Sequence, residues 1–324
     1  MMLQTYSSIT DYSNTKPSVV TIGTFDGVHI GHKKIIKRLT NIAHKEQLAS
    51  VVLTFFPHPR MVLQKDNSIE LLNTMDEKKA ILDSIGLAHL VVHPFTYEFS
   101  RLTAQEFVED VLVKQLNIKK IIIGYDHRFG RDRNADINDL KRYGKQHGFD
   151  VEEISAQQLD DVSVSSTKIR NALKKGDIAT ANAYLGYPYA LSGVVTRGKG
   201  LGKTIGFPTA NLHLTEDYKL IPKNGVYVSQ AKINNTLVYG LTSIGTNPTV
   251  GGVDKTIETY FLNVSQDLYD QPLTIELLTK IRNEEKFDSV ASLQTAIKSD
   301  EQCALPIYIS TTAASLFLER SLVC

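Results

Sequence analysis

Hydrophobic residues follow two different patterns along the chain. In the first half, short aliphatic and β-branched runs alternate with segments whose apolar residues recur at helical spacing. Five runs predict buried strands: Ser18–Gly23, Ser50–Phe56, Leu90–Val92, Ile121–Gly124 and Val151–Ile154. Helices are predicted from about residue 31 and over 76–86, 103–116 and 136–147. This alternation favours a parallel, doubly wound sheet, in which ligands bind beyond the carboxyl ends of the strands.

Short strands and turns replace this alternation after Tyr187. Asn234 and Asn235 separate two apolar runs, 225–233 and 237–244, and predict a hairpin turn. Two further strands and one helix are predicted at Thr256–Val264, Leu273–Leu278 and Ser289–Lys298. Closely spaced strands of this kind favour a small β-barrel. We therefore predict an α/β domain over residues 1–186, followed by a β-barrel domain over residues 187–303.

Composition narrows the function classes. Of the 324 residues, 42% are hydrophobic and 22% are charged, which is typical of a soluble protein with buried cores. The net charge of +1 gives no electrostatic case for nucleic acid or a membrane surface as a partner. Two cysteines, no signal-peptide pattern and no apolar run of the ~20 residues that span a bilayer favour a cytoplasmic location. We expect a monomer or a weak homo-oligomer.

The string GTFDGVHIGH, residues 23–32, follows a predicted strand and enters a predicted helix. Such a strand–turn–helix unit directs free backbone N–H groups at an anion. Gly31 lets a phosphate approach the backbone, and His29 and His32 can donate hydrogen bonds to phosphate oxygens in a transition state. The alternative is that the glycines only form a turn and the histidines only cap the helix.

The whole string resembles the HxGH signature of the nucleotidyltransferase superfamily. It most resembles the FMN adenylyltransferase module of bacterial bifunctional riboflavin kinase/FAD synthetases. The resemblance implies a Rossmann-like domain in which His29 and His32 are catalytic. It also implies an ATP-binding turn made of Gly23, Thr24, Phe25, Asp26 and Gly31.

Three later segments resemble that family in the same order. TFFPHP is similar to its flavin-side loop, and the resemblance implies flavin contacts at Pro57, His58 and Pro59. GYDHRFGR resembles its GxDFxFG motif and implies flavin contacts at Asp126 and Phe129, with His127 where phenylalanine is common. SSTKIR alone is a plain helix N-cap. In this order it resembles an ATP-phosphate segment with Ser165, Ser166, Thr167 and Arg170.

The second half contains a glycine-rich stretch, GVVTRGKGLGKTIGFPTANL, at residues 193–212. GLGKT is not a P-loop, because Arg197 stands where that motif requires its first glycine. The stretch resembles the riboflavin kinase signature. The resemblance implies that Gly198, Lys203 and Thr209 bind ATP and that Thr209 and Asn211 bind Mg²⁺, which prefers such hard oxygen ligands.

Transfer of phosphate to a hydroxyl requires a group that accepts the proton. Resemblance to the kinase family places this base at Glu258, and the alternative is a carboxylate on the surface of a strand. KIRNEEKF resembles a flavin-side segment and implies flavin contacts at Arg282 and Glu284, with Phe287 closing over the ring. For these residues, an ordinary solvated face is the alternative.

The resemblance implies two reactions that need Mg²⁺. The barrel would phosphorylate riboflavin to FMN with ATP, and the α/β domain would join FMN to a second ATP, forming FAD and releasing pyrophosphate. One rival hypothesis is a cytidylyltransferase-like enzyme with a single activity. Another is a flavin-binding or regulatory protein without catalysis. The kinase signature opposes the first, and the intact histidines and Glu258 oppose the second.

The resemblance covers about Ser18 to Asp300 and ends before the last 21 residues. Residues 304–324, ALPIYISTTAASLFLERSLVC, are unlike the helical end of the family. We interpret them as an atypical tail, because a frameshift or read-through of a sequencing adapter would encode ALPI at this point. Reading the underlying DNA tests this interpretation.

Overall fold

The computed structural model describes residues 2–13, 15–64, 69–124, 127–155, 164–198, 200–249, 252–264 and 266–321. Side chains are described for these residues except at 201, 247–249, 252–254 and 310–321. The chain forms two units, Met1–Ser166 and Thr167–Cys324.

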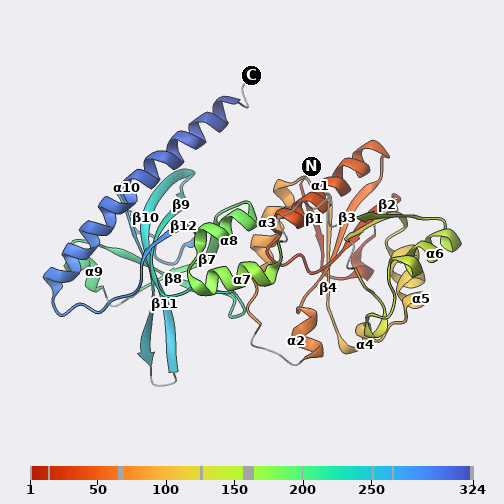
Figure 1. Ribbon diagram of the computed structural model, residues 1–324, viewed down its shortest axis with the longest axis horizontal. Helices are drawn as coiled ribbons and strands as arrows, with labels where there is room; N and C mark the ends of the chain where they lie inside the picture. The colour runs from red at the N-terminus through yellow and green to blue at the C-terminus, as the bar shows by residue number, and fades with distance from the viewer. Residues whose placement is uncertain are drawn as a thin grey trace. The chain divides into compact units, whose positions relative to one another are not determined.

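The first unit is built on a six-stranded sheet in the order β1-β4-β3-β2-β5-β6 (Figure 1). Every pair of neighbouring strands is parallel, as the sequence predicts. The strands are β1 (Gln4–Tyr6), β2 (Ser18–Ile22), β3 (Ala49–Phe55), β4 (His89–His93), β5 (Ile118–Gly124) and β6 (Asp150–Ile154). The chain order runs outward from β2 in both directions, apart from the short edge strand β1, so β2 lies at the switch point where such sheets bind ligands.

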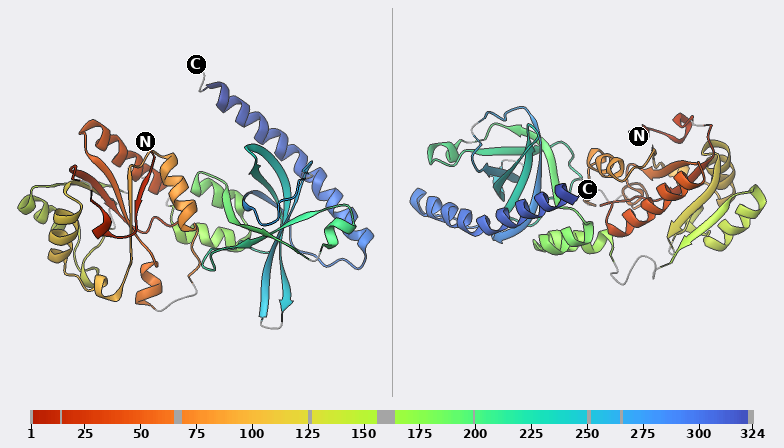
Figure 2. Two further views of the ribbon diagram at one scale, coloured as in Figure 1. Left: turned by 180° about the vertical axis from the view of Figure 1, so that it is seen from behind. Right: turned by 90° about the horizontal axis from the view of Figure 1, so that it is seen from above.

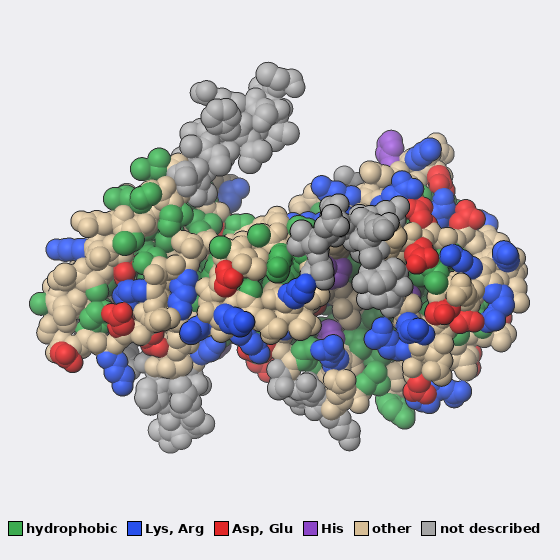
Figure 3. Space-filling view, viewed as in Figure 1, with side chains coloured by type: hydrophobic (Ala, Val, Ile, Leu, Met, Phe, Trp, Pro, Cys, Tyr) green, Lys and Arg blue, Asp and Glu red, His purple; other side chains and the backbone are tan. Residues whose placement is uncertain are grey.

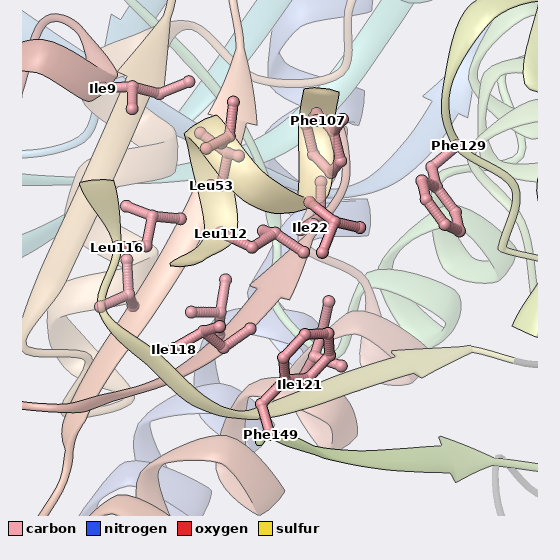
Figure 4. Close-up of a cluster of buried hydrophobic side chains, with 14 of the residues drawn as sticks. Ile9, Ile22, Leu53, Phe107, Leu112, Leu116, Ile118, Ile121, Phe129 and Phe149 are labelled. Atoms are coloured by element: carbon pink, nitrogen blue, oxygen red, sulfur yellow. The ribbon is translucent and has the colours of Figure 1, made fainter. Parts of the chain in front are cut away.

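Helices cover both faces of this sheet. On one face, α1 (Ile30–Lys45) and α3 (Met75–Ser84) bury their apolar residues against the strands. On the other face, η1 (Ile9–Asp11), the π-helix η2 (Phe107–Gln115) and α6 (Ile137–His147) enclose the cluster of side chains in Figure 4. Four short helices complete the unit: α2 (Pro59–Leu63), α4 (Tyr97–Ser100), α5 (Ala104–Glu106) and η3 (Arg131–Arg133).

The N-terminal segment, to which the hydrophobic pattern assigns no element, binds along β4 through two histidines. The hydroxyl of Tyr6 lies 3.1 Å from Nδ1 of His89. The backbone N–H of Ile9 donates to Nδ1 of His93 at 3.3 Å. Burial lowers the pKa of both imidazoles, and Lys16 lowers that of His89 further. Both rings are therefore uncharged at neutral pH, and Nδ1 of His93 acts as an acceptor.

The second unit contains the predicted barrel, closed in the order β10-β11-β8-β7-β12-β9. Its strands are β7 (Tyr189–Thr196), β8 (Thr209–Leu214), β9 (Gly225–Ile233), β10 (Thr236–Thr249), β11 (Gly252–Phe261) and β12 (Pro272–Arg282). The predicted hairpin turn is confirmed. Asn234 and Asn235 join β9 to β10 with φ angles of 49° and 62°, which asparagine tolerates.

Two helices before the barrel belong to the second unit, apart from the first residue of α7. They are α7 (Ser166–Lys175) and α8 (Ile178–Leu185). The Asn182 amide of α8 donates to the Leu277 carbonyl at 2.8 Å and accepts from the Tyr189 N–H at 2.7 Å. The side chain therefore joins α8 to both β12 and β7.

The C-terminal helix α10 (Val290–Ser321) runs along the outside of the barrel (Figure 2). It extends well beyond the predicted helix at 289–298 and contains Pro306. Ala304 and Tyr308 are buried against Val228 and Leu241, and the Tyr308 hydroxyl donates to the Gly240 carbonyl at 3.1 Å. The first residues of the atypical segment therefore pack on the barrel, while the interpretation of its origin stays a prediction.

Charges of both signs are distributed over the surface. In Figure 3, Lys and Arg side chains are interspersed with Asp and Glu on the face in view, in keeping with a net charge of +1. Among the helices of the described residues, none combines the length and the apolar character needed to cross a membrane.

Candidate active sites

The loop between β2 and α1 is held from several sides. The carbonyl oxygen of Thr24 accepts hydrogen bonds from the Thr54 hydroxyl at 3.2 Å and from Nζ of Lys78 at 2.8 Å. The carboxylate of buried Asp26 accepts the Leu72 N–H at 2.9 Å. These bonds hold a backbone with positive φ at three residues: Phe25, Gly27 and Val28. Side chains of β3 and α3 thus fix the turn that precedes the helix.

His29 and His32 lie together at the beginning of α1. His29 caps the helix, and its Nδ1 accepts the backbone N–H of His32 at 3.4 Å. The two rings stack with centroids 3.6 Å apart. Because Nδ1 of His29 is an acceptor, the neutral ring carries its proton on Nε2 and can donate it. Nδ1 of His32 is buried and has no hydrogen-bond partner among the described residues, which suits contact with a ligand atom.

Burial keeps both imidazoles uncharged at neutral pH. Desolvation lowers the pKa of His29 from 6.5 to about 4, against an opposing effect of the Asp26 carboxylate. Desolvation also lowers the pKa of His32 well below its usual value, and His29 and Lys78 lower it further. Two neutral rings at a helix N-terminus can each donate one N–H to an anion without a fixed positive charge.

Two glycines leave the space that this arrangement needs. A Cβ at Gly31 would lie 3.3 Å from the His29 ring, and one at Gly23 would lie 3.2 Å from the Phe25 ring. The Phe25 ring in turn meets the His32 ring nearly edge-on, with centroids 5.1 Å apart. The predicted residues Gly23, Thr24, Phe25, Asp26 and Gly31 are therefore brought together with both histidines.

The predicted flavin-side loops follow the two strands that flank β2, because β3 and β5 both pair with it in parallel. The loop after β3 carries Pro57, His58 and Pro59, and His58 caps α2 by accepting a backbone N–H at 3.2 Å. The loop after β5 carries Phe129, which is buried, whereas Asp126 lies outside the described residues. The described residues of this set therefore lie at the same edge of the sheet as the histidine pair.

A series of aromatic rings, of which the sequence motifs predicted only Phe129, joins these two loops. Phe55, at the end of β3, contacts Phe95 and Phe99 with ring centroids 5.5 Å apart in each pair. Phe99 lies 6.2 Å from Phe107, which lies 6.0 Å from Phe129. The available signal was the position of phenylalanines at or just after the carboxyl ends of predicted strands.

The SSTKIR segment is attached to the histidine turn at its beginning. The hydroxyl of Ser166 donates to the carbonyl of Asp26 at 2.8 Å, and Ser165, which precedes it, is half-buried. Thr167 and Arg170 lie on α7 in the second unit, where Thr167 is exposed and Arg170 half-buried. The role of all four residues at an ATP phosphate stays a prediction.

The residues predicted for the kinase reaction lie on the outer face of the barrel. Glu258 of β11 pairs directly with Asn211 of β8, so their side chains project from the same face. The Thr209 hydroxyl donates to the Glu258 carboxylate at 3.3 Å. Neighbours of opposite orientation are buried in the barrel: Ala210, Leu212, Ile257 and Thr259. The structure therefore brings Thr209, Asn211 and Glu258 together.

The glycine-rich segment lies directly against this cluster. A Cβ at Gly198 would lie 2.4 Å from Nδ2 of Asn211, and one at Gly202 would lie 2.3 Å from the Phe207 carbonyl oxygen. Any side chain at position 198 would therefore displace the Asn211 amide. Lys203 is exposed on the short helix α9 (Leu201–Thr204), which ends three residues before Phe207.

Arg282 and Glu284 have partners within the fold. The Arg282 guanidinium forms a two-pronged ion pair with buried Asp300 of α10, at 3.0 Å and 2.9 Å, and lies over the Phe287 ring at 5.5 Å. The Glu284 carboxylate accepts the Asn224 amide at 2.8 Å. These contacts give both residues a role in fixing the chain around α10 and β12, and their flavin contacts stay predictions.

Together, the sheet and the barrel define a two-part enzyme: a nucleotidyltransferase-like unit with its HxGH turn, and a barrel with a glycine-backed oxygen cluster. A family model described as FAD synthetase matches residues 11–168, and one described as riboflavin kinase matches residues 185–307. The chain belongs to the family of bifunctional riboflavin kinase/FMN adenylyltransferases.

The relatives span nearly the whole chain. The bifunctional riboflavin kinase/FMN adenylyltransferase of Escherichia coli K12 is 37% identical over 297 residues, which cover 91% of this chain and 94% of the relative. The enzyme of Listeria monocytogenes is 37% identical over 286 residues, which cover 88% of this chain and 90% of the relative. A crystal structure described as a macrolide-efflux protein from Streptococcus pneumoniae has 32% identity and a TM-score of 0.86 over 94% of this chain and 99% of that one. The predicted family, fold class and bifunctional activity are confirmed.

Proposed function

We propose that the first unit forms FAD at the turn between β2 and α1, with His29 and His32 as the catalytic donors. A phosphate oxygen of FMN attacks the α-phosphorus of ATP, and the bond to pyrophosphate breaks. The observation that carries this proposal is the stacked, uncharged histidine pair at the α1 N-terminus, in which Nδ1 of His32 has no partner among the described residues. Hydrogen bonds from the His29 Nε2–H and from α1 stabilise the charge that develops on the phosphate oxygens.

The loops beside this turn would bind the two substrates. The half-buried rings of Phe55, Phe95 and Phe99 offer flat apolar surface to a flavin ring next to Pro57, His58 and Pro59. The turn at Gly23–Gly31, together with Ser165 and Ser166 of the same unit, would hold the ATP phosphates. The hydrogen bond from Ser166 to Asp26 supports this assignment, since it joins the two segments.

In the barrel, we propose that Glu258 is the base of riboflavin phosphorylation. The carboxylate accepts the proton of the ribityl 5′-hydroxyl while that oxygen bonds to the γ-phosphorus of ATP and the bond to ADP breaks. The Thr209 hydroxyl donates to the Glu258 carboxylate and so orients it. Gly198 and Lys203 would contact the ATP phosphates, and Arg282 and Glu284 would border the flavin.

The oxygen atoms of Thr209 and Asn211 suit Mg²⁺. The metal takes hard oxygen donors, few of them from protein, and both side chains project from one face of β8 beside a carboxylate. When bound there with ATP, Mg²⁺ would neutralise phosphate charge. The absence of a side chain at Gly198 supports this site, because a Cβ there would displace the Asn211 amide.

We further propose that the functional boundary lies near residue 186, with adenylyl transfer assigned to 1–186 and phosphorylation to 187–303. The two family models leave a gap between residues 168 and 185, which supports a boundary in this region. The protein would work as a monomer or weak homo-oligomer in the cytoplasm. The free, exposed Cys303 is compatible with a reducing compartment.

Separation of flavin products tests both sites in one reaction. The protein is incubated with riboflavin, ATP and Mg²⁺, and the flavins are resolved by chromatography. We expect both FMN and FAD from the unmodified chain and FMN alone from His29→Ala. Glu258→Gln should form neither product from riboflavin, but it should form FAD when FMN is supplied. Equal loss of FMN and FAD formation in His29→Ala would contradict two separate sites.

A further inference from the structure

Lys78 occupies a position that is unfavourable for a lysine on two counts. It is 5% exposed, although a buried ammonium loses its hydration. It also lies in the first turn of α3, where the helix dipole disfavours positive charge. Residues that occupy locally unfavourable positions, as Lys78 does, are concentrated at functional sites.

The side chain of Lys78 contacts the histidine turn. Its Nζ donates to the Thr24 carbonyl at 2.8 Å, the same oxygen that the Thr54 hydroxyl binds. Burial lowers the pKa of Lys78, and the Asp26 carboxylate opposes this effect by favouring the charged form. Lys78 in turn lowers the pKa of His32, in addition to the larger effects of burial and His29. The side chain therefore lies within electrostatic reach of two residues of the GTFDGVHIGH string without belonging to it.

We propose that Lys78 is a positioning residue for adenylyl transfer: it holds the Thr24 carbonyl and with it the turn that carries His29 and His32. The inference rests on the proposed role of the turn in FAD formation. The bond to Thr24 fixes the beginning of the turn, just before the residues with φ of 44°, 84° and 32° at Phe25, Gly27 and Val28. A relaxed turn would move the His29 ring and the first N–H groups of α1 from the phosphate.

The electrostatic part of the proposal depends on the groups that surround His32. The charged or titratable groups that act on His32 are His29, the N-cap of α1, and Lys78 from α3, whereas Asp26 of the turn acts on His29. Asp26 favours protonation of the neighbouring His29, whereas Lys78 opposes protonation of His32. Removal of the ammonium should raise the pKa of His32, and this change can be observed without any turnover.

The experiment compares three variants of the full chain. Lys78→Met removes the charge and the donor at similar length, and Lys78→Arg retains a charge. Lys79→Met is the matched control, because Lys79 is the next residue of α3 and pairs instead with exposed Asp76 at 3.0 Å. For each, we measure FAD formation from FMN, FMN formation from riboflavin, and the NMR titration of the His32 ring, assigned with His32→Gln.

We expect Lys78→Met to lower kcat for FAD formation on the order of ten- to a hundredfold, with a smaller change in KM and unchanged FMN formation. Its His32 ring should titrate at higher pH than in the unmodified chain. Lys78→Arg should leave that titration near its original position, and Lys79→Met should change nothing. The NMR titration stays informative when a variant is less stable, because it reads the folded fraction alone.

Two results would overturn the proposal. One is an unchanged His32 titration and kcat in Lys78→Met, and the other is an equal shift in Lys78→Met and Lys78→Arg, since packing alone would then explain it. His29→Ala in parallel separates the two hypotheses. If His29→Ala still forms FAD, the proposed site itself is wrong. If His29→Ala loses FAD formation while Lys78→Met behaves like the unmodified chain, the site is supported and the role of Lys78 is not.

Discussion

The imidazole rings of His29 and His32 stack with their centroids 3.6 Å apart and their planes 18° from parallel. Two rings at this distance cannot both carry a charge at modest cost, because like charges oppose each other's ionisation. Burial acts in the same direction and is the larger effect on both residues. The pair is therefore a neutral donor set, distinct from the lysines and arginines that usually bind phosphate.

The first prediction concerns acid stability. The pKa of His29 is about 4 in the folded chain and 6.5 as an ordinary value. As the pH falls below 6.5, the unfolded chain binds a proton that the folded chain refuses, so the free energy of unfolding decreases until about pH 4. The loss should be on the order of 3 kcal/mol. Denaturant titrations of His29→Asn should show a shallower pH dependence; an identical slope would refute the assignment.

The second prediction concerns Gly198. A methyl group at this position would overlap the Asn211 amide, whose Nδ2 lies 2.4 Å from the point that a Cβ would occupy. Gly198→Ala should therefore reduce FMN formation at least tenfold by displacing Asn211. FAD formation from supplied FMN should not change. Gly200→Ala serves as a comparison for backbone strain alone, because its φ is 72° and, its chain neighbours aside, no atom of the described residues lies within 4 Å of its Cβ position.

The third prediction concerns the ion pair between Arg282 and Asp300. Asp300→Asn leaves a half-buried guanidinium without its carboxylate and should destabilise the second unit by about 3 kcal/mol. The double variant Arg282→Met with Asp300→Leu should recover most of that loss in thermal unfolding. If Arg282 also contacts flavin, the double variant keeps a raised KM for riboflavin. A normal KM would remove Arg282 from the flavin site.

The fourth prediction concerns the N-terminal segment. His93 accepts the Ile9 N–H through Nδ1, so protonation of this nitrogen breaks the bond. The pKa of both His89 and His93 is lowered by burial, so the attachment is complete above pH 6.5 and weakens as the pH falls toward the folded pKa values. Hydrogen exchange of residues 4–12 should accelerate in mild acid before that of β2. Simultaneous acceleration of both would contradict a local release.

Much of the fold could be predicted because its strands are short, apolar and regularly separated by helices. β1 was missed because three residues carry too little pattern, and it forms only by pairing with β4. α8 was missed because ATANAYL has little amphipathic contrast; its stability comes from Asn182 and the barrel. The sequence predicts α10 only to Lys298, whereas the helix continues because Ala304 and Tyr308 pack against the barrel like core residues.

The candidate sites were predictable where a motif is continuous in sequence, as at His29, His32, Thr209 and Asn211. Lys78 was not predictable. In the helix MDEKKAILDS, Lys78 and Lys79 are chemically identical neighbours, and only the tertiary fold buries the first and exposes the second. The pairing of Arg282 with Asp300 was equally hidden, because the two residues lie on separate elements.

The oxygen cluster of the barrel lies on its outer face, backed by glycines, while the inward side chains of the same strands are closely packed. Protein engineers can therefore treat the lumen and the reacting surface as separate design problems. The inward-facing residues Ala210 and Ile257 are candidates for thermostabilising replacement, whereas changes to Gly198, Thr209 or Glu258 are expected to alter the proposed site. A heat-resistant flavin kinase could be derived from this chain by redesigning only residues that never meet a substrate.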